Sequence, residues 1–191
     1  MRLILASASA RRRELLETAG IPFVVDAANV DERVHAGESP EAYAGRVAMA
    51  KADWGRARHA SEVVLGADTI VVIDGAILGK PASDADAVSM LTRLSGRDHE
   101  VLTAVAFAWP TAQSRVHLER TRVWFTTMTP AEVDWYVKTG EPADKAGAYA
   151  IQGLGSRFVR RIDGSYSSVV GLPVATVLQF LREIGVNDDR P

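Results

Sequence analysis

The chain has 191 residues, a length that fits one domain. Its composition, with 47% hydrophobic and 24% charged residues, excludes a disordered chain. The formal net charge of −2 argues against a dedicated nucleic-acid-binding domain, because such a domain usually carries a basic excess. The absence of cysteine excludes disulfides, thiolate metal sites and a cysteine nucleophile.

The first third of the chain predicts alternating strands and helices. Leu3–Ala6 is a short apolar run typical of a buried strand. Ser9 is a suitable N-cap for a helix that Gly20 ends, and Pro22–Val25 is predicted to be extended. Ser39 opens a second helix, with proline at its first position.

The middle of the chain contains the strongest hairpin signal. Val63–Ile73 is an apolar run, and Asp74-Gly75 after it is typical of a tight turn to a return strand at Ala76–Leu78. Ser83 is predicted to cap a third helix. The remaining predicted elements are two long strands, a helix with a capping box, a further strand and a last helix: Val101–Ala108, Val116–Phe125, Thr129–Gly140, Phe158–Ile162 and Pro173–Ile184.

This mixture predicts an α/β or α+β domain with a mixed sheet, because hairpins join antiparallel strands. Residues 186–191 are polar and are expected to form a frayed tail. The N-terminus lacks the pattern of a secretory signal, and no apolar run approaches the roughly 20 residues of a membrane span. We therefore expect a cytoplasmic protein that does not bind membranes.

Three arginines, Arg11, Arg12 and Arg13, fall in the first turn of the helix that Ser9 caps. The helix dipole favours acids there by about 0.3–1 kcal/mol, so cations lie at the unfavourable end. The free amides of the same turn attract anions, and guanidinium groups beside them would form a phosphate or carboxylate cradle. The alternative is an ordinary solvated basic face.

Asp68 stands inside an otherwise apolar run. Burying an unpaired carboxylate costs several kcal/mol, so this position predicts a metal, a cation or a proton-handling role. The alternative is an aspartate bonded to backbone amides at a bulge. Lys51 shares the predicted inner face of the second helix with Tyr43 and Trp54. It can extend to solvent, or it can direct its ammonium at a bound phosphate.

Three further features have weaker signals. Gly79-Lys80-Pro81 is not a Walker A motif, since no Ser or Thr follows the lysine, but Lys80 can still meet an anion. Asp31-Glu32 is either a solvated pair or, with Asp68, a set of oxygen ligands for a hard cation such as Mg²⁺. The glycines of Gly153-Leu154-Gly155 do not fit a dinucleotide fingerprint and predict a tight loop that approaches a ligand.

Five segments in register resemble the Maf family of nucleoside triphosphate pyrophosphatases. They correspond to its patterns S-x-S-P-R-R-x-E-L-L, G-A-D-T, G-K-P, D-K-A-G-A-Y-G-I-Q-G and G-S-Y-x-x-V-V-G-L-P. In this chain they are Ser7–Leu16, Gly66–Thr69, Gly79–Pro81, Asp144–Gly153 and Gly164–Pro173. Two positions depart from the patterns: Ala10 stands for proline and Ala150 for glycine.

The resemblance implies one domain over residues 1–191 that hydrolyses a nucleoside triphosphate to the monophosphate and pyrophosphate. The implied fold is a mixed twisted sheet flanked by helices, with two lobes around a deep cleft, similar to the inosine triphosphatase-like fold. A homodimer is implied as well. Asp68 matches the family's base, and Arg11, Thr69 and Gln152 match the substrate-selecting positions of the subfamily that acts on dTTP and UTP.

The residues and the resemblance together predict a nucleotide-pool enzyme for dTTP, UTP and modified pyrimidine nucleotides. Glu32 and Asp68 would hold a divalent cation, Mg²⁺ or alternatively Mn²⁺, and Asp68 would orient or deprotonate the attacking water. The alternatives are a 7-methyl-GTP pyrophosphatase and a non-catalytic nucleotide-binding module in septum or growth control. The predicted substrate-binding residues are Ser9, Arg11, Arg12, Lys51, Thr69, Lys80 and Gln152.

Overall fold

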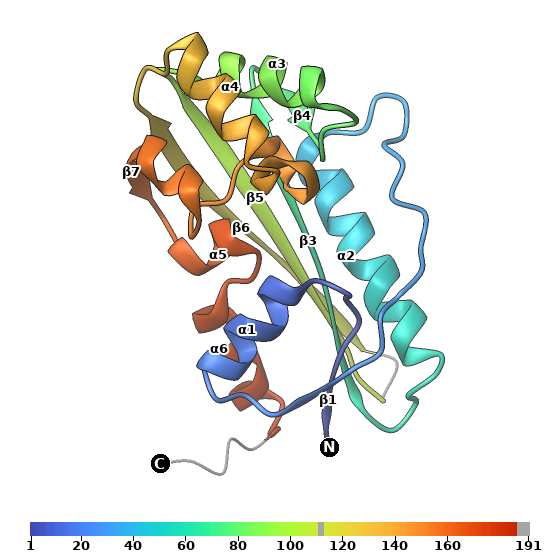
Figure 1. The fold of residues 1–191 in the computed structure, drawn as a ribbon. Helices are drawn as coiled ribbons and strands as arrows, with labels where there is room; N and C mark the ends of the chain where they lie inside the picture. Colours follow the sequence, from blue (N-terminus) through green and yellow to red (C-terminus); the bar gives the residue numbers. More distant parts are fainter. Residues whose placement is uncertain (111–112, 187–191) are drawn as a thin grey trace. The chain divides into compact units, whose positions relative to one another are not determined.

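The computed structural model describes residues 1–110 and 113–186. The chain forms two compact units (Figure 1). The first consists of Met1–Asp68, Thr103–Glu119 and the segment that starts at Gly171, and the second of Thr69–Leu102 and Arg120–Val170. Residues 187–191, most of the predicted frayed tail, lie outside the described residues.

The described strands form one mixed sheet of seven strands in the order β2-β1-β3-β5-β6-β7, with β4 paired to β3. β1 is parallel to β2 and to β3, whereas the β3–β4 and β6–β7 pairs are antiparallel. The strands are β1 Leu3–Leu5, β2 Phe23–Val25, β3 Val63–Ile73, β4 Ala76–Leu78, β5 Asp98–Ala108, β6 Ser114–Phe125 and β7 Val159–Asp163.

The helices begin where the capping residues predict. The side chains of Ser9, Ser39 and Ser83 each accept a hydrogen bond from the backbone of the following helix, and Thr129 forms the predicted capping box with Glu132. The helices are α1 Ala10–Thr18, α2 Pro40–Arg56, α3 Asp84–Leu94, α4 Pro130–Lys138, α5 Tyr166–Val170 and α6 Val174–Glu183. None of these described helices combines the length and the apolar composition that a membrane crossing requires.

The core of the first unit consists of strand residues packed against α1 and α6. Leu3 and Leu5 of β1 and Leu65 of β3 are fully buried in one cluster with Leu16 of α1 and Val177 of α6. Leu16 of α1 and the apolar face of the amphipathic helix α6 therefore cover the sheet within this unit.

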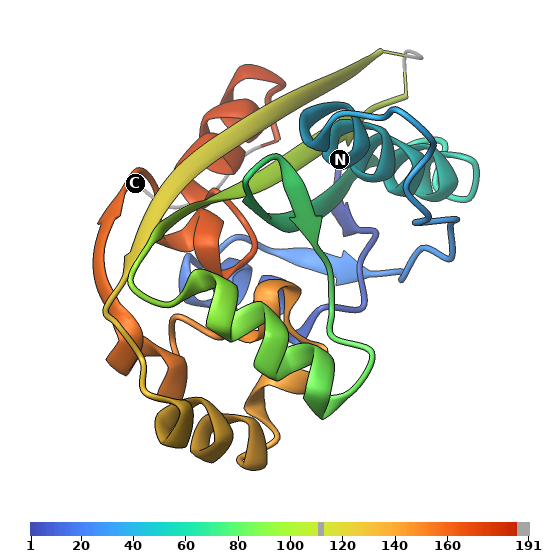
Figure 2. The ribbon, with the colours of Figure 1, turned by 90° about the horizontal axis from the view of Figure 1, so that it is seen from above.

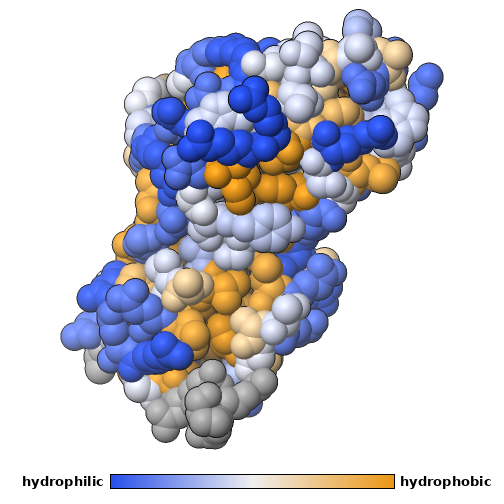
Figure 3. All heavy atoms as spheres, turned by 90° about the vertical axis from the view of Figure 1, so that its left-hand side faces the viewer, coloured by the Kyte–Doolittle hydropathy of each residue, from blue (hydrophilic) through white to orange (hydrophobic). Residues whose placement is uncertain are grey.

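In the second unit α3 packs against α4, and the two helices lie side by side in Figure 2. Three short 3₁₀ turns follow α4: η1 Glu141–Asp144, η2 Ala146–Ala148 and η3 Leu154–Phe158. Some large apolar side chains stay exposed, including Trp135 and Leu154, and Figure 3 shows apolar residues at the surface among hydrophilic ones. Exposed apolar side chains are ordinary at the surface of a folded domain.

Candidate active site

The N-terminus of α1 is ordered by serine hydroxyls. Ser9 has extended backbone angles, and its side chain accepts a hydrogen bond from the backbone amide of Arg12 at 3.4 Å. The Ser7 hydroxyl accepts two more bonds, from the Ser9 amide at 3.3 Å and from the Arg12 guanidinium at 2.9 Å. The first turn of α1 therefore brings two of the predicted binding residues, Ser9 and Arg12, together.

Arg12 is built into the first unit and is only 8% exposed. Its Nε donates to the carbonyl of Gly171 at 2.9 Å. Burial lowers the pKa of the guanidinium, while the negative charges of Asp68 and Glu32 oppose that shift. The positive charge of Arg12 therefore interacts electrostatically with the two predicted metal-binding carboxylates.

Gly66 sets how closely β3 approaches α2. A Cβ at this position would lie 2.6 Å from the backbone nitrogen of Ala52 and would collide with the carbonyl of Ala48. Only glycine lets the strand and helix backbones come this near. The close packing places Lys51, on the inner face of α2, next to Asp68 on β3.

Lys51 joins the two predicted metal-binding carboxylates. Its Nζ lies 2.9 Å from Oδ1 of Asp68 and 2.9 Å from Oε1 of Glu32. The Lys51 and Asp68 side chains are 8% and 10% exposed, whereas the Glu32 side chain is 52% exposed. The buried carboxylate that the sequence singled out therefore has a cation as its partner, and Asp68 lies within a continuous strand.

Tyr43 holds the loop that carries Glu32. Its hydroxyl donates to the backbone carbonyl of Glu32 at 2.8 Å. Burial and the nearby charges of Asp68 and Glu32 raise the pKa of Tyr43 to about 12, so the hydroxyl keeps its proton. Sequence reasoning placed Tyr43 on the inner face of α2 but gave it no role. The signal was the hydroxyl itself, because a buried tyrosine needs a hydrogen-bond partner.

Of the other predicted site residues, Arg11 lies half-buried on α1 in the first unit, and the remaining three belong to the second unit. Thr69 is half-buried, whereas Lys80 and Gln152 are exposed. The backbone amide of Gly147 donates to the carbonyl of Gly79 at 3.0 Å. This bond joins the segment that carries Lys80 to the glycine-containing segment that leads to Gln152.

The carboxylates of Glu32 and Asp68 fit a divalent cation that binds together with a phosphate. Among the described residues, no group of three or more His, Asp or Glu side chains could hold a metal ion. Mg²⁺ usually binds through one or two carboxylates and completes its shell with substrate phosphates and water. Two carboxylates that already share one cation, the Lys51 ammonium, provide that donor set.

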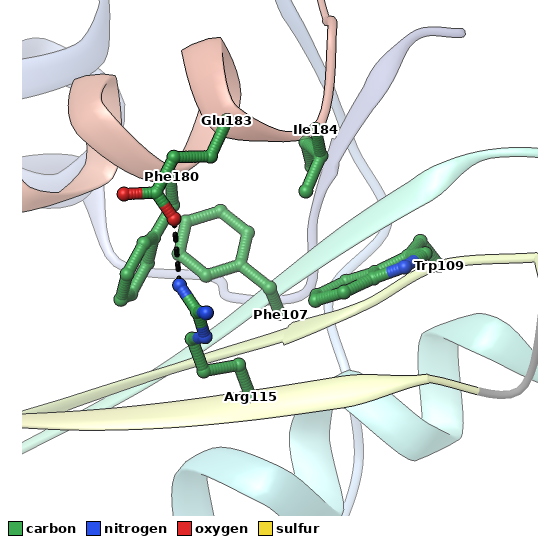
Figure 4. Close-up of a pocket in the computed structure, with 6 residues that line it drawn as sticks. All are labelled: Phe107, Trp109, Arg115, Phe180, Glu183 and Ile184. Carbon is green, nitrogen blue, oxygen red and sulfur yellow. Dashed lines mark hydrogen bonds and ion pairs between the residues drawn. The ribbon is translucent and has the colours of Figure 1, made fainter.

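A separate pocket in the first unit has a volume of about 180 Å³ (Figure 4). Arg115 bonds to Glu183 at 2.7 Å at its edge, and the Phe107 and Phe180 rings meet edge to face. None of the predicted site residues contributes to this pocket. Its lining residues are Phe107, Trp109, Arg115, Phe180, Glu183 and Ile184.

Comparison with known proteins extends the likeness over almost the whole chain. The sequence profile of the family described as Maf-like protein matches residues 2–184. The dTTP/UTP pyrophosphatase of Myxococcus xanthus is 50% identical over 184 residues, which cover 96% of this chain and 93% of that protein. The dTTP/UTP pyrophosphatase of an Anaeromyxobacter species is 53% identical over 188 residues, which cover 96% and 90%.

The structure of the Staphylococcus aureus Ham1 protein covers 96% of this chain and 99% of its own, with a TM-score of 0.54 and 12% sequence identity. At that identity the likeness shows a shared fold alone, and it confirms the mixed α/β architecture that was expected. Because the family profile matches residues 2–184 and relatives at about half identity cover 96% of the sequence, the chain belongs to the Maf family.

Proposed function

We propose that this chain hydrolyses dTTP and UTP to the monophosphate and pyrophosphate. The observation that carries the proposal is the buried Asp68–Lys51 pair with Glu32 beside it, in a chain about half identical to dTTP/UTP pyrophosphatases. A carboxylate held in place next to cationic groups is suited to orient the attacking water where polyphosphate charge is neutralised.

Phosphate binding is assigned first to the N-terminus of α1. The positive end of the α1 dipole and the guanidinium groups of Arg11 and Arg12 favour an anion there, and Ser9 orders the turn. Lys51 and Lys80 are proposed to supply further positive charge to the triphosphate. Phosphoryl transfer depends mainly on positioning and on charge neutralisation, which these groups provide.

The proposed step is attack of one water molecule on the α phosphorus, at the anhydride bond between the α and β phosphates. Asp68 accepts a proton from the water, the new P–O bond forms as the anhydride bond breaks, and pyrophosphate leaves. Lys51 compensates the charge of Asp68 and holds its carboxylate in place until then. A divalent cation held by Glu32 and Asp68 would neutralise phosphate charge and help to orient the water.

Selection of the base is assigned to Gln152 and Thr69. The amide of Gln152 has both a donor and an acceptor, which suits the edge of a uracil or thymine ring. Its side chain is exposed and so can reach a ligand. The same hydrogen-bonding edge would also admit pyrimidines that are modified elsewhere on the ring.

A panel assay tests the proposal. Release of pyrophosphate is measured with Mg²⁺ for dTTP, UTP, dCTP, GTP and 7-methyl-GTP. We expect turnover of dTTP and UTP above the others. Turnover of 7-methyl-GTP alone would contradict the assignment of Gln152 and Thr69, and binding of nucleotides without any turnover would contradict catalysis.

A further inference from the structure

The carboxylate of Glu141 binds the loop that carries Gln152. Oε2 of Glu141 accepts a hydrogen bond from the backbone amide of Leu154 at 2.9 Å, and Oε1 accepts one from the amide of Gly155 at 3.0 Å. All of these residues belong to the second unit. One side chain on η1 therefore holds two successive amides just after Gln152.

Tyr136 of α4 binds the backbone on the other side of Gln152. Its hydroxyl donates to Oε1 of Glu141 at 2.6 Å and accepts a bond from the backbone amide of Ala150 at 3.1 Å. The Tyr136 side chain is fully buried. The pair therefore fixes the backbone two residues before Gln152 and again two and three residues after it.

Two glycines make this arrangement possible. A Cβ on Gly153 would lie 2.5 Å from the carboxyl carbon of Glu141, and a Cβ on Gly155 would lie 2.5 Å from the Tyr136 hydroxyl. Side chains at either position would push the loop away from its two partners. The absence of side chains at these two glycines therefore leaves room for Glu141 and Tyr136 of the same chain.

The protonation states agree with this pattern of donors. Burial alone would raise the pKa of the Glu141 carboxyl, but the hydrogen bonds from Tyr136 and the two backbone amides outweigh it and lower that pKa. Burial and the bond to Glu141 raise the pKa of the Tyr136 hydroxyl. At neutral pH the carboxylate accepts all three bonds and the phenol keeps its proton.

Gln152 is exposed between these anchored residues, whereas Ala150 and Ile151 are 6% and 7% exposed. We propose that Glu141, acting with Tyr136, is the positioning residue for Gln152 and so sets the preference for pyrimidine bases. The proposal rests on the function assigned to Gln152 above. A loop ordered before binding loses less conformational entropy when the ligand arrives, which favours affinity and selectivity.

Amide hydrogen exchange tests the anchor without using activity. In Glu141→Ala, exchange at Leu154 and Gly155 is expected to rise about tenfold or more, while α6 keeps its protection. Glu141→Gln retains Oε1 as an acceptor and should show a smaller rise. Asp134→Asn removes the same charge from an exposed position on α4 and should leave the exchange of both amides unchanged. Unchanged exchange at both amides in Glu141→Ala would overturn the proposal.

Steady-state kinetics test the route through Gln152. Glu141→Gln is expected to raise KM for dTTP and UTP about tenfold and to leave kcat within about threefold. In a Gln152→Ala background the same substitution should change KM less than about twofold, because a residue that acts through Gln152 has nothing left to position. An effect of equal size in both backgrounds would overturn the positioning role.

The outcomes separate the two proposals. A wild-type protein that turns over neither dTTP nor UTP contradicts the proposed function, and the exchange data then decide whether Glu141 anchors the loop. A wild type that prefers pyrimidines, combined with additive effects of Glu141→Gln and Gln152→Ala, contradicts the positioning role alone. Thermal unfolding of each variant, expected within a few degrees of wild type for Glu141→Gln, verifies that the fold is kept.

Discussion

Nζ of Lys51 lies 2.9 Å from Oδ1 of Asp68, although the two residues are 17 positions apart in the chain and both side chains are buried. Each of these charges alone would be costly to remove from water. Their pairing explains how the apolar strand β3 tolerates an aspartate at this point.

Removing the cation from this pair should destabilise the fold. Lys51→Met leaves the buried carboxylate of Asp68 without its partner, and we expect the free energy of unfolding to fall by about 3 kcal/mol at pH 7. The double variant Lys51→Met/Asp68→Asn should recover more than half of that loss. Urea denaturation of the wild type, the two single variants and the double variant gives the coupling energy between Lys51 and Asp68. Strictly additive losses in the free energy of unfolding would contradict the pairing.

A methyl group at Gly66 should separate β3 from α2. Gly66→Ala brings a Cβ within 2.6 Å of the Ala52 nitrogen, and we expect a loss of about 3 kcal/mol or more in the free energy of unfolding. Gly45→Ala on the same helix is the matched control, since among the described residues its Cβ would meet only Val116, at 3.8 Å. That control should gain about 0.5–1 kcal/mol from helix propensity.

The buried His99 should make stability depend on pH. Its Nε2 lies 2.8 Å from the Tyr149 hydroxyl, and its Nδ1 has no hydrogen-bond partner among the described residues. Burial lowers the pKa of His99 to about 4, below its ordinary 6.5. As the pH falls through 6.5, the unfolded chain takes up a proton that the native state refuses, so stability is lost between about pH 6.5 and pH 4.

The size of this effect can be isolated with His99→Gln. Between pH 7 and pH 5, the free energy of unfolding of the wild type should fall by about 2 kcal/mol more than that of the variant. Urea denaturation at several pH values measures the difference. Parallel pH profiles for the two proteins would mean that His99 titrates normally in the native state.

The carboxylate of Glu32 should tune the affinity for metal. Chelation of divalent cations is expected to stop turnover and added Mg²⁺ to restore it. Glu32→Gln should raise the Mg²⁺ concentration for half-maximal activity about tenfold or more, because it removes one charged oxygen ligand. The control Asp31→Asn changes the neighbouring acid, which is paired with Arg33, and should leave the Mg²⁺ requirement as in the wild type.

Turn and capping residues predicted the element boundaries well, because the interactions that form a turn or a cap involve residues close together in the sequence. The Asp74-Gly75 turn needs two positive φ angles, and the structure has φ of 53° and 74° there. The hydroxyls of Ser9 and Thr129 cap helices that start one residue later. Strand β5 begins at Asp98, before the predicted Val101, because pairing in a sheet extends strands past their apolar residues.

Contacts between distant residues were less accessible to sequence reasoning. Lys51 and Asp68 were both singled out, but their pairing depends on how α2 packs against β3 through Gly66. The hold of Glu141 on the loop had no sequence pattern, since two of its three donors are backbone amides. Helix α5 was not predicted, because Tyr166–Val170 is too short to show a period.

A comparison of the wild type with Asp68→Asn tests most directly whether Asp68 drives hydrolysis of dTTP and UTP. Pyrophosphate release from dTTP and UTP is measured with Mg²⁺, together with binding of a non-hydrolysable dTTP analogue. We predict that the variant binds the analogue normally but turns over about 10³-fold more slowly. Undiminished pyrophosphate release by Asp68→Asn would contradict this role and remove Asp68 from the chemistry.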